Sequence, residues 1–309
     1  TTITDLSKKE HLENSFQDGD YTFNKVSFLY GANGSGKTFF CKILREIQRI
    51  LDWSPISAMS NNSQFLSLPG FKGIDASVRP FAFDEDYRNK PTDFMIEIVL
   101  QGIAYRYEFS VLGKEIIAEK LTKKRRRTET LIERTSSSYK DISLFSELKS
   151  FESTKQVVKE SALCLPVAAI LNNSLAAKIV AAIKGITVVS MTAARLNPAE
   201  SEASFSKDRI EKYVRILRKA DPTLRDMKVS VEQEEVSRQK FDDDDFENRE
   251  LIATKTTVGV ETAHAVYQNG EETRTEPLSF LVEESLGTVK LFTALPYLFD
   301  VLEEGGVLV

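Results

Sequence analysis

The sequence predicts an α/β fold with a strand, a glycine-rich loop and a helix, joined by an antiparallel β-subdomain and an inserted, mainly helical lobe. Three observations carry this prediction. A short apolar run at 26–30 leads into a glycine-rich turn and then into apolar residues at helical spacing. Alternation with a period of two follows between residues 79 and 134. Residues 155–220 then favour helices.

The composition is that of an ordinary globular chain. With 309 residues, 41% of them hydrophobic and 28% charged, the chain has room for one large or two modest domains and is not a mainly disordered, collagen-like or coiled-coil protein. Its 41 Lys and Arg against 46 Asp and Glu give a net charge of −5, so DNA binding is possible but not indicated. We expect no signal peptide and no membrane partner, because no uncharged apolar run is long enough to cross a bilayer. Two distant cysteines and two distant histidines fit a reduced, cytoplasmic location better than a disulfide framework or a zinc site.

The first elements are expected in direct succession. Residues 26–30 combine apolar and β-favouring side chains, which predicts a buried strand. An amphipathic helix of about four turns is predicted by the spacing of Phe39, Phe40, Ile43, Leu44, Ile47, Ile50 and Leu51. Residues 54–75 are rich in Ser, Asn, Gly and Pro and predict a surface loop.

The middle of the chain predicts a meander and then helices. Apolar residues alternate with polar ones on both sides of a turn at Gln101-Gly102, and the pattern continues through 116–121 and 130–133. One helix is expected to end at Asp221-Pro222, its apolar face formed by Ile210, Tyr213, Val214 and Leu217.

The last third predicts strands and a final helix. Strands are expected at 227–233 and 251–258, and Asn269-Gly270 is typical of a tight hairpin turn. The last helix is expected to be kinked by Pro296. These elements divide the chain into an N-terminal part of one domain at 1–150, an inserted helical lobe at 151–225 and a C-terminal part at 226–309.

Eight consecutive residues match the phosphate-loop pattern G-x-x-x-x-G-K-[ST] at every fixed position. They are Gly31, Ala32, Asn33, Gly34, Ser35, Gly36, Lys37 and Thr38. Glycines let the backbone N–H groups turn inward onto phosphate oxygens, and the next helix, starting near Phe39, aims its positive end at them. Lys37 is expected to bind the β- and γ-phosphates, and the Thr38 hydroxyl to bind Mg²⁺. The alternative is a glycine-rich turn with a surface lysine.

A second motif stands before the last helix. Glu284 is followed by Ser285, Leu286, Gly287 and Thr288, and a serine and a glycine at a helix start can bind an anion. The alternative is a simple helix N-cap by Ser285. The stretch Gly305-Gly306-Val307-Leu308-Val309 follows the helix.

Together these motifs resemble the ABC-type P-loop ATPases related to the SMC and RecF-like proteins, in particular the RloA-like branch of anti-phage defence modules. In that branch the ABC signature is E-S-L-G-T ahead of a helix, followed by G-G-V-L-V, as at residues 284–288 and 305–309. The runs at 83–85, 89–94 and 105–107 look like the family's approach to its β-meander. The resemblance touches residues 22–134 and 277–309.

The resemblance implies an ATPase that uses ATP and Mg²⁺ and forms a homo-oligomer. The signature residues Ser285, Gly287 and Thr288 of one subunit would close over the nucleotide of another, so that Lys37 and Ser285 both serve hydrolysis. It further implies a TOPRIM-type effector nuclease as partner and a phage protein as trigger. In the family an Asp-Glu pair follows G-G-V-L-V, and we expect this pair directly after Val309. The Q-loop glutamine has two candidates, Gln64 and Gln101, with Asp84 as a replacement.

Two other functions fit parts of the pattern. A RecF/SMC-like ATPase would act on DNA ends, and a small-molecule kinase would share only the phosphate loop. The basic run 123–127 could bind nucleic acid, although a solvated hairpin tip is favoured. The acidic run 242–245 favours a loop over a metal site, and His264 is expected to be structural, without a partner triad.

Overall fold

The computed structural model describes residues 12–59, 78, 85–136, 139–141, 158, 161–189, 202–238 and 251–309. The chain forms two compact units, here called unit 1 (residues 1–188) and unit 2 (residues 189–309). Each has a hydrophobic core of its own. The mixed α/β class with antiparallel sheets is confirmed.

Unit 1 is built on a five-stranded antiparallel sheet in the order β3-β4-β5-β6-β7. Its strands are β3 (Thr92–Leu100), β4 (Ile103–Leu112), β5 (Glu115–Lys124), β6 (Thr128–Thr135) and β7 (Tyr139–Asp141). Along β4, Tyr105, Tyr107, Phe109 and Val111 are buried. The expected meander is therefore confirmed, including the β3–β4 turn, where Gln101 and Gly102 both have positive φ.

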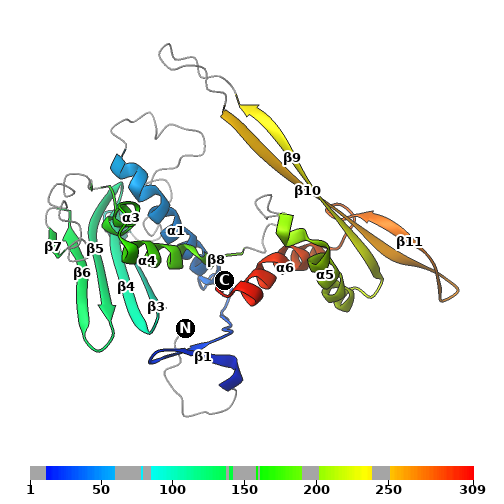
Figure 1. The fold of residues 1–309 in the computed structure, drawn as a ribbon, viewed down its shortest axis with the longest axis horizontal. Coiled ribbons are helices and arrows are strands. Elements are labelled where there is room, and N and C mark those ends of the chain that lie inside the picture. The colour runs from blue at the N-terminus through cyan, green and yellow to red at the C-terminus, as the bar shows by residue number, and fades with distance from the viewer. Residues whose placement is uncertain are drawn as a thin grey trace. The chain divides into compact units, whose positions relative to one another are not determined.

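Three helices lie along one face of this sheet (Figure 1) and share its core. They are α1 (Lys37–Met59), α3 (Cys164–Ile170) and α4 (Ser174–Lys184). The amphipathic helix is confirmed, since Ile47, Ile50 and Leu51 are buried. It is longer than predicted, which corrects the expected loop at 54–75 for its first residues. Ser54 is fully buried and its hydroxyl accepts a hydrogen bond from the Leu163 amide, so packing holds this polar stretch in the helix. Residues 60–75 lie outside the described residues.

A buried ion pair holds α3 to the sheet. The Glu119 carboxylate accepts hydrogen bonds from the Tyr107 hydroxyl at 2.8 Å and from Arg134 Nε at 2.9 Å. It also accepts from the backbone amides of Cys164 at 2.7 Å and Leu165 at 3.0 Å, which are the first amides of α3. Burial, together with the neighbouring negative charge of Glu119, raises the pKa of the Tyr107 hydroxyl and of the Cys164 thiol well above their usual values.

The start of the described chain differs from the prediction. After the short helix η1 (Leu12–Asn14), strands β1 (Ser15–Asp18) and β2 (Tyr21–Asn24) form a hairpin. The predicted buried strand at 26–30 is wrong for this structure, because no strand of the described residues pairs with it. An apolar segment becomes a buried strand only through a pairing neighbour, and here Phe28 and Tyr30 are 77% and 84% exposed.

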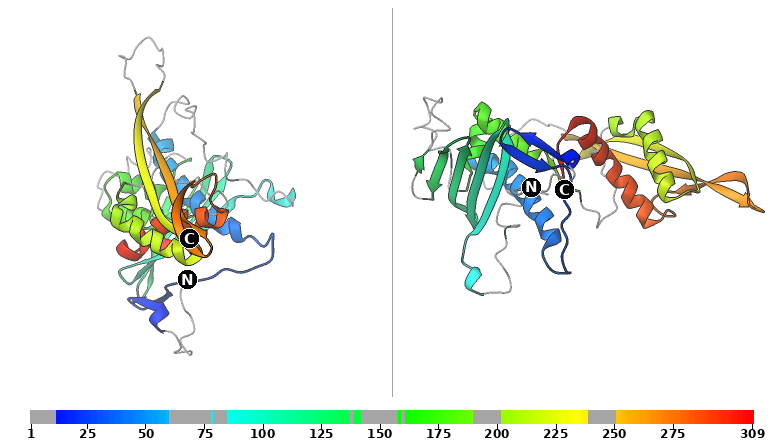
Figure 2. Two further views of the ribbon diagram at one scale, coloured as in Figure 1. Left: turned by 90° about the vertical axis from the view of Figure 1, so that its right-hand side faces the viewer. Right: turned by 90° about the horizontal axis from the view of Figure 1, so that it is seen from below.

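Unit 2 contains a three-stranded antiparallel sheet in the order β11-β10-β9 and two long helices. The strands are β9 (Leu224–Arg238), β10 (Leu251–Gln268) and β11 (Glu271–Ser279), and the hairpin of β9 and β10 extends beyond the helices (Figure 2). The helices are α5 (Lys207–Ala220) and α6 (Leu286–Glu304), with the short helix η6 (Glu202–Phe205) before α5. The base of the hairpin shares one core with α5 and α6.

Several predictions for unit 2 are confirmed. Tyr213, Val214 and Leu217 are buried on one face of α5, which is capped by Asp221. Asn269 and Gly270 have φ of 55° and 87° in the β10–β11 turn. Helix α6 continues through Pro296 to Glu304, and β12 (Val307–Leu308) follows it.

The helices expected in one inserted lobe fall into both units. Helices α3 and α4 belong to the core of unit 1, whereas α5 belongs to the core of unit 2. Unit 1 also contains β8 (Ile186–Thr187) and the short, exposed helix η4 (Glu85–Tyr87). The assignment of 1–150, 151–225 and 226–309 to parts of one ATPase domain stays a prediction. Within the described ranges, no single helix has the length and apolar composition of a membrane span, and only the bent pair of α3 and α4 has them jointly.

Candidate functional site

The loop at 31–38 has the backbone shape that a phosphate site needs. Gly34 and Gly36 have φ of 81° and 91°, a region that residues with a side chain rarely adopt. The amide of Ser35 donates to the carbonyl of Ala32 at 3.2 Å, which closes the turn. A Cβ atom built at Gly34 or Gly36 would meet no atom within 4 Å, so the space beside the loop is open. Alternating left- and right-handed backbone of this kind makes a concave row of N–H groups that binds anions.

Lys37 extends over this loop. Its ammonium donates hydrogen bonds to the carbonyl oxygens of Gly31 and Ala32, both at 2.7 Å. The cationic end of the side chain thus lies over the same turn as the row of N–H groups. Phosphate oxygens carry more negative charge than these carbonyls and are stronger acceptors for an ammonium group.

Helix α1 begins at Lys37 and is fixed at its far half. The side-chain amide of Gln48 donates to the carbonyls of Ile183 at 3.0 Å and Ile186 at 2.7 Å, and Arg45 donates to that of Val188 at 2.9 Å. The first turn of α1 is exposed, including Thr38 and Phe39. The amides of Phe39 and Phe40 donate to the carbonyl of Gly36 at 2.9 and 3.2 Å, so the amides of Lys37 and Thr38, at the start of an anchored helix, are the ones placed to meet an anion.

The donor set of the loop fits a nucleoside triphosphate with Mg²⁺. It combines an ammonium group, a row of amides and the exposed Thr38 hydroxyl, which is the residue that would hold Mg²⁺. Mg²⁺ would neutralise phosphate charge there. All eight residues predicted from the loop pattern lie together on one turn in the structure.

The second predicted motif lies at the start of α6 in unit 2. The Ser285 hydroxyl accepts a hydrogen bond from the Thr288 amide at 3.1 Å and lies 2.8 Å from the Thr288 hydroxyl, so the N-cap is confirmed. Ser285 and Gly287 are exposed, whereas Thr288 is buried. Exposed apolar side chains surround this helix start: Leu281, Val282 and Leu286. Whether this helix start serves as an anion site stays a prediction.

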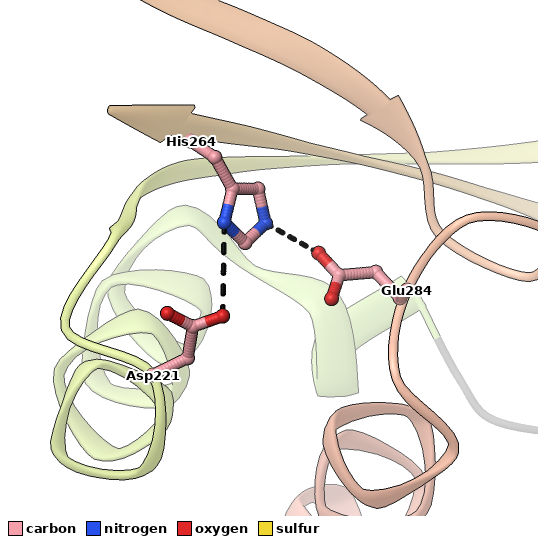
Figure 3. Close-up of side chains that lie close together, drawn as sticks. All are labelled: Asp221, His264 and Glu284. Carbon is pink, nitrogen blue, oxygen red and sulfur yellow. Dashed lines mark hydrogen bonds and ion pairs between the residues drawn. The ribbon is translucent and has the colours of Figure 1, made fainter. Parts of the chain in front are cut away.

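A cluster of charged side chains adjoins this motif (Figure 3). Ligand atoms of Asp221, His264 and Glu284 all lie within 4.8 Å of one another. His264 Nε2 lies 2.5 Å from Glu284 Oε1, and His264 Nδ1 lies 3.7 Å from Asp221 Oδ2. The structure thus gives His264 two acidic neighbours that the sequence did not indicate, and its structural role stays a prediction. Its neighbours are 43 and 20 residues away in the sequence, at the end of α5 and just before α6, and the fold of unit 2 brings them together, which no local pattern indicates.

The remaining candidate residues lie in or beside turns between strands, or outside the described residues. The basic run covers the end of β5, at Lys123 and Lys124, and the turn 125–127 before β6. Lys124 and the turn are exposed and Lys123 pairs with Glu129 at 3.0 Å, as expected of a solvated tip. Gln101 lies in the β3–β4 turn with φ of 53°. The residues Gln64 and Asp84 and the acidic run 242–245 lie outside the described residues.

One comparison with known proteins gives a match. The family described as "AAA domain, putative AbiEii toxin, Type IV TA system" matches residues 26–162, which is less than half of the chain. This match indicates a P-loop ATPase-like domain in the part that contains the loop and the five-stranded sheet. No curated protein and no solved structure matches the chain.

Proposed function

We propose that this chain is the ATP-binding and ATP-hydrolysing switch subunit of an anti-phage defence assembly. The observation that carries the proposal is the loop 31–38, in which Gly34 and Gly36 have positive φ and Lys37 begins an anchored helix, within an ATPase-like domain. The description of the matching family names a putative AbiEii toxin, which supports a role in abortive infection.

In this proposal the nucleotide site is completed by a second copy of the chain. Lys37 and the loop amides bind the phosphates, and Thr38 holds Mg²⁺. Ser285 and Gly287 of another subunit supply a hydroxyl and amides to the γ-phosphate. Their exposure and the exposed Leu281, Val282 and Leu286 around them suit a surface that a neighbouring subunit covers.

The partner proposed for this switch is a TOPRIM-type nuclease that the ATPase restrains until a phage protein triggers its release. What supports it is the resemblance to the RloA-like branch, within which the chain looks similar to AriA, the ATPase subunit of the PARIS defence system.

Replacing Thr38 tests the proposal. Thr38→Ala in the full-length protein should remove Mg²⁺-dependent phosphate release, since it deletes the proposed metal ligand. Thr38→Ser keeps the hydroxyl and should retain most of the activity, and cells with the Ala variant should lose protection against phage. Equal hydrolysis by the wild type and the Ala variant would contradict the assignment.

The second candidate function is an ATPase that acts on DNA ends, favoured by the exposed cations at the β5–β6 turn. It predicts DNA binding that weakens steeply with salt and that is lost when Arg125, Arg126 and Arg127 are replaced by Gln. A gel-shift titration at two salt concentrations separates it from the switch, which needs no DNA.

A further inference from the structure

Glu284, which directly precedes the N-cap Ser285 of α6, is held by side chains of unit 2. The Glu284 side chain is only 3% exposed, although it is a carboxylate. Its Oε1 accepts a hydrogen bond from the Thr262 hydroxyl at 2.5 Å and lies 2.5 Å from His264 Nε2. Both partners belong to β10. Glu284 therefore ties the segment just before Ser285 to one strand of the long hairpin.

The other nitrogen of His264 continues the link to the end of α5. Nδ1 lies 2.9 Å from the Thr223 hydroxyl, which itself lies 2.6 Å from Asp221 Oδ1. A carboxylate only accepts, so the Thr223 proton points to Asp221, and Thr223 Oγ1 is an acceptor for the ring. By the same rule Nε2 donates to Glu284. Each ring nitrogen of His264 thus has an oxygen partner of its own, and the ring lies between the Asp221 and Glu284 carboxylates (Figure 3).

This geometry favours a bridge over a metal site. Each ring nitrogen lies next to a different partner, whereas a metal ion would need one nitrogen to give up its proton and its hydrogen bond. The buried Glu284 carboxylate already has two close partners among the described residues.

We propose that His264 is a positioning residue for Ser285 and Gly287. Through His264, the β9–β10 hairpin controls the position of the N-cap and first turn of α6. This rests on the proposed function, in which these two residues meet the γ-phosphate. The hairpin strands β9 and β10 have 15 and 18 residues. A partner that shifts the hairpin moves His264, and with it Glu284 and the N-cap.

The first test uses His264→Gln and His264→Leu in the full-length protein. The side chain of the glutamine variant can still donate to Glu284 but cannot reach Thr223 at the same time. It is therefore expected to fold even if the leucine variant does not. Hydrogen exchange without nucleotide should be at least about tenfold faster at the amides of Thr288 and Val289 and unchanged in α1. Glu272→Gln is the matched control, because Glu272 on β11 pairs with Arg225 on β9 at 2.7 Å in the same sheet and is not a member of the Asp221–His264–Glu284 cluster. Unchanged exchange at both amides in both His264 variants would overturn the proposal, whatever the ATPase activity.

The second test measures the ATPase. His264→Gln should lower kcat about tenfold while the Kd for ATP changes less than about twofold, because the loop with Lys37 does not depend on the bridge. Combined with Ser285→Ala, it should cause little further loss, since both changes act on the same helix start. Fully additive losses, or a normal kcat with a weakened Kd, would overturn the positioning role. Stoichiometric Zn²⁺ binding by calorimetry that disappears in His264→Gln would assign the cluster to a metal and overturn the bridge.

Discussion

Asp221 shows how one residue's chemistry depends on its local hydrogen bonds. Its pKa is lowered, first by the Thr223 hydroxyl and then by backbone hydrogen bonds and the nearby His264. A carboxyl whose folded pKa lies below its unfolded pKa stabilises the fold at pH values above the unfolded one, about 3.9, and this stabilisation is lost as the pH falls through the folded pKa.

Thr223→Val tests this assignment. It removes the largest contribution to the low pKa of Asp221, so the melting temperature should fall at neutral pH, and the difference from the wild type should shrink below about pH 4. Thermal unfolding at both pH values is the measurement. A difference that stays the same in acid would show that the hydrogen bond acts only through packing.

At the residue scale, features set by neighbouring residues in the sequence could be predicted, whereas contacts between residues far apart in the sequence could not. The phosphate loop was predicted residue by residue, because its chemistry requires fixed residue types at fixed spacing. The Ser285 N-cap was one of two alternatives, and the structure shows it. Neither the Asp221–His264–Glu284 cluster nor the Glu119–Arg134 pair was predicted, because each joins residues from separate elements.

At the element scale, Glu119 joins the sheet to α3. Glu119→Gln removes the negative charge that lies against the guanidinium of Arg134, a residue that is 3% exposed. Loss of one member of a buried pair costs about 3–5 kcal/mol in the free energy of unfolding. Urea unfolding followed by Trp53, the chain's single tryptophan and part of α1, reports on unit 1.

Glu108→Gln is the matched control. Glu108 pairs with Arg106 at 2.8 Å on the same sheet, but both side chains are exposed to solvent by more than a third. Its loss should therefore cost at most about 1 kcal/mol. Equal destabilisation by the two variants would mean that the buried pair does not anchor α3.

The elements predicted best were those whose own sequence has a clear hydrophobic periodicity or a clear turn motif. The meander, the amphipathic face of α1, α5 and the Asn269-Gly270 turn needed only local information. Residues 26–30 had the composition of a strand, but a strand also needs a neighbour, which composition does not reveal. Residues 54–59 had a loop composition and are helical, because Ser54 and Pro55 pack inside unit 1.

At the scale of the whole molecule, the proposed composite site uses residues from both units. Lys37 belongs to unit 1 and Ser285 to unit 2. Mixing full-length Lys37→Ala with full-length Ser285→Arg should restore part of the ATP hydrolysis that each lacks alone, because some pairings place an intact loop opposite an intact helix start. Native mass spectrometry must show that mixed oligomers form. Background hydrolysis by such oligomers at every ratio would contradict the shared site.

The central claim, nucleotide binding by the loop 31–38, is tested most directly by calorimetric titration of Mg·ATP into the wild type, Lys37→Ala and Lys42→Ala. Lys42 is an exposed lysine one turn further along α1, so its loss changes the net charge equally without touching the loop. Lys37→Ala should weaken ATP binding at least about tenfold, the effect of losing one charge-assisted contact. Its melting temperature should hardly change, because the loop is exposed. Lys42→Ala should bind like the wild type. Unchanged affinity in Lys37→Ala would contradict the account.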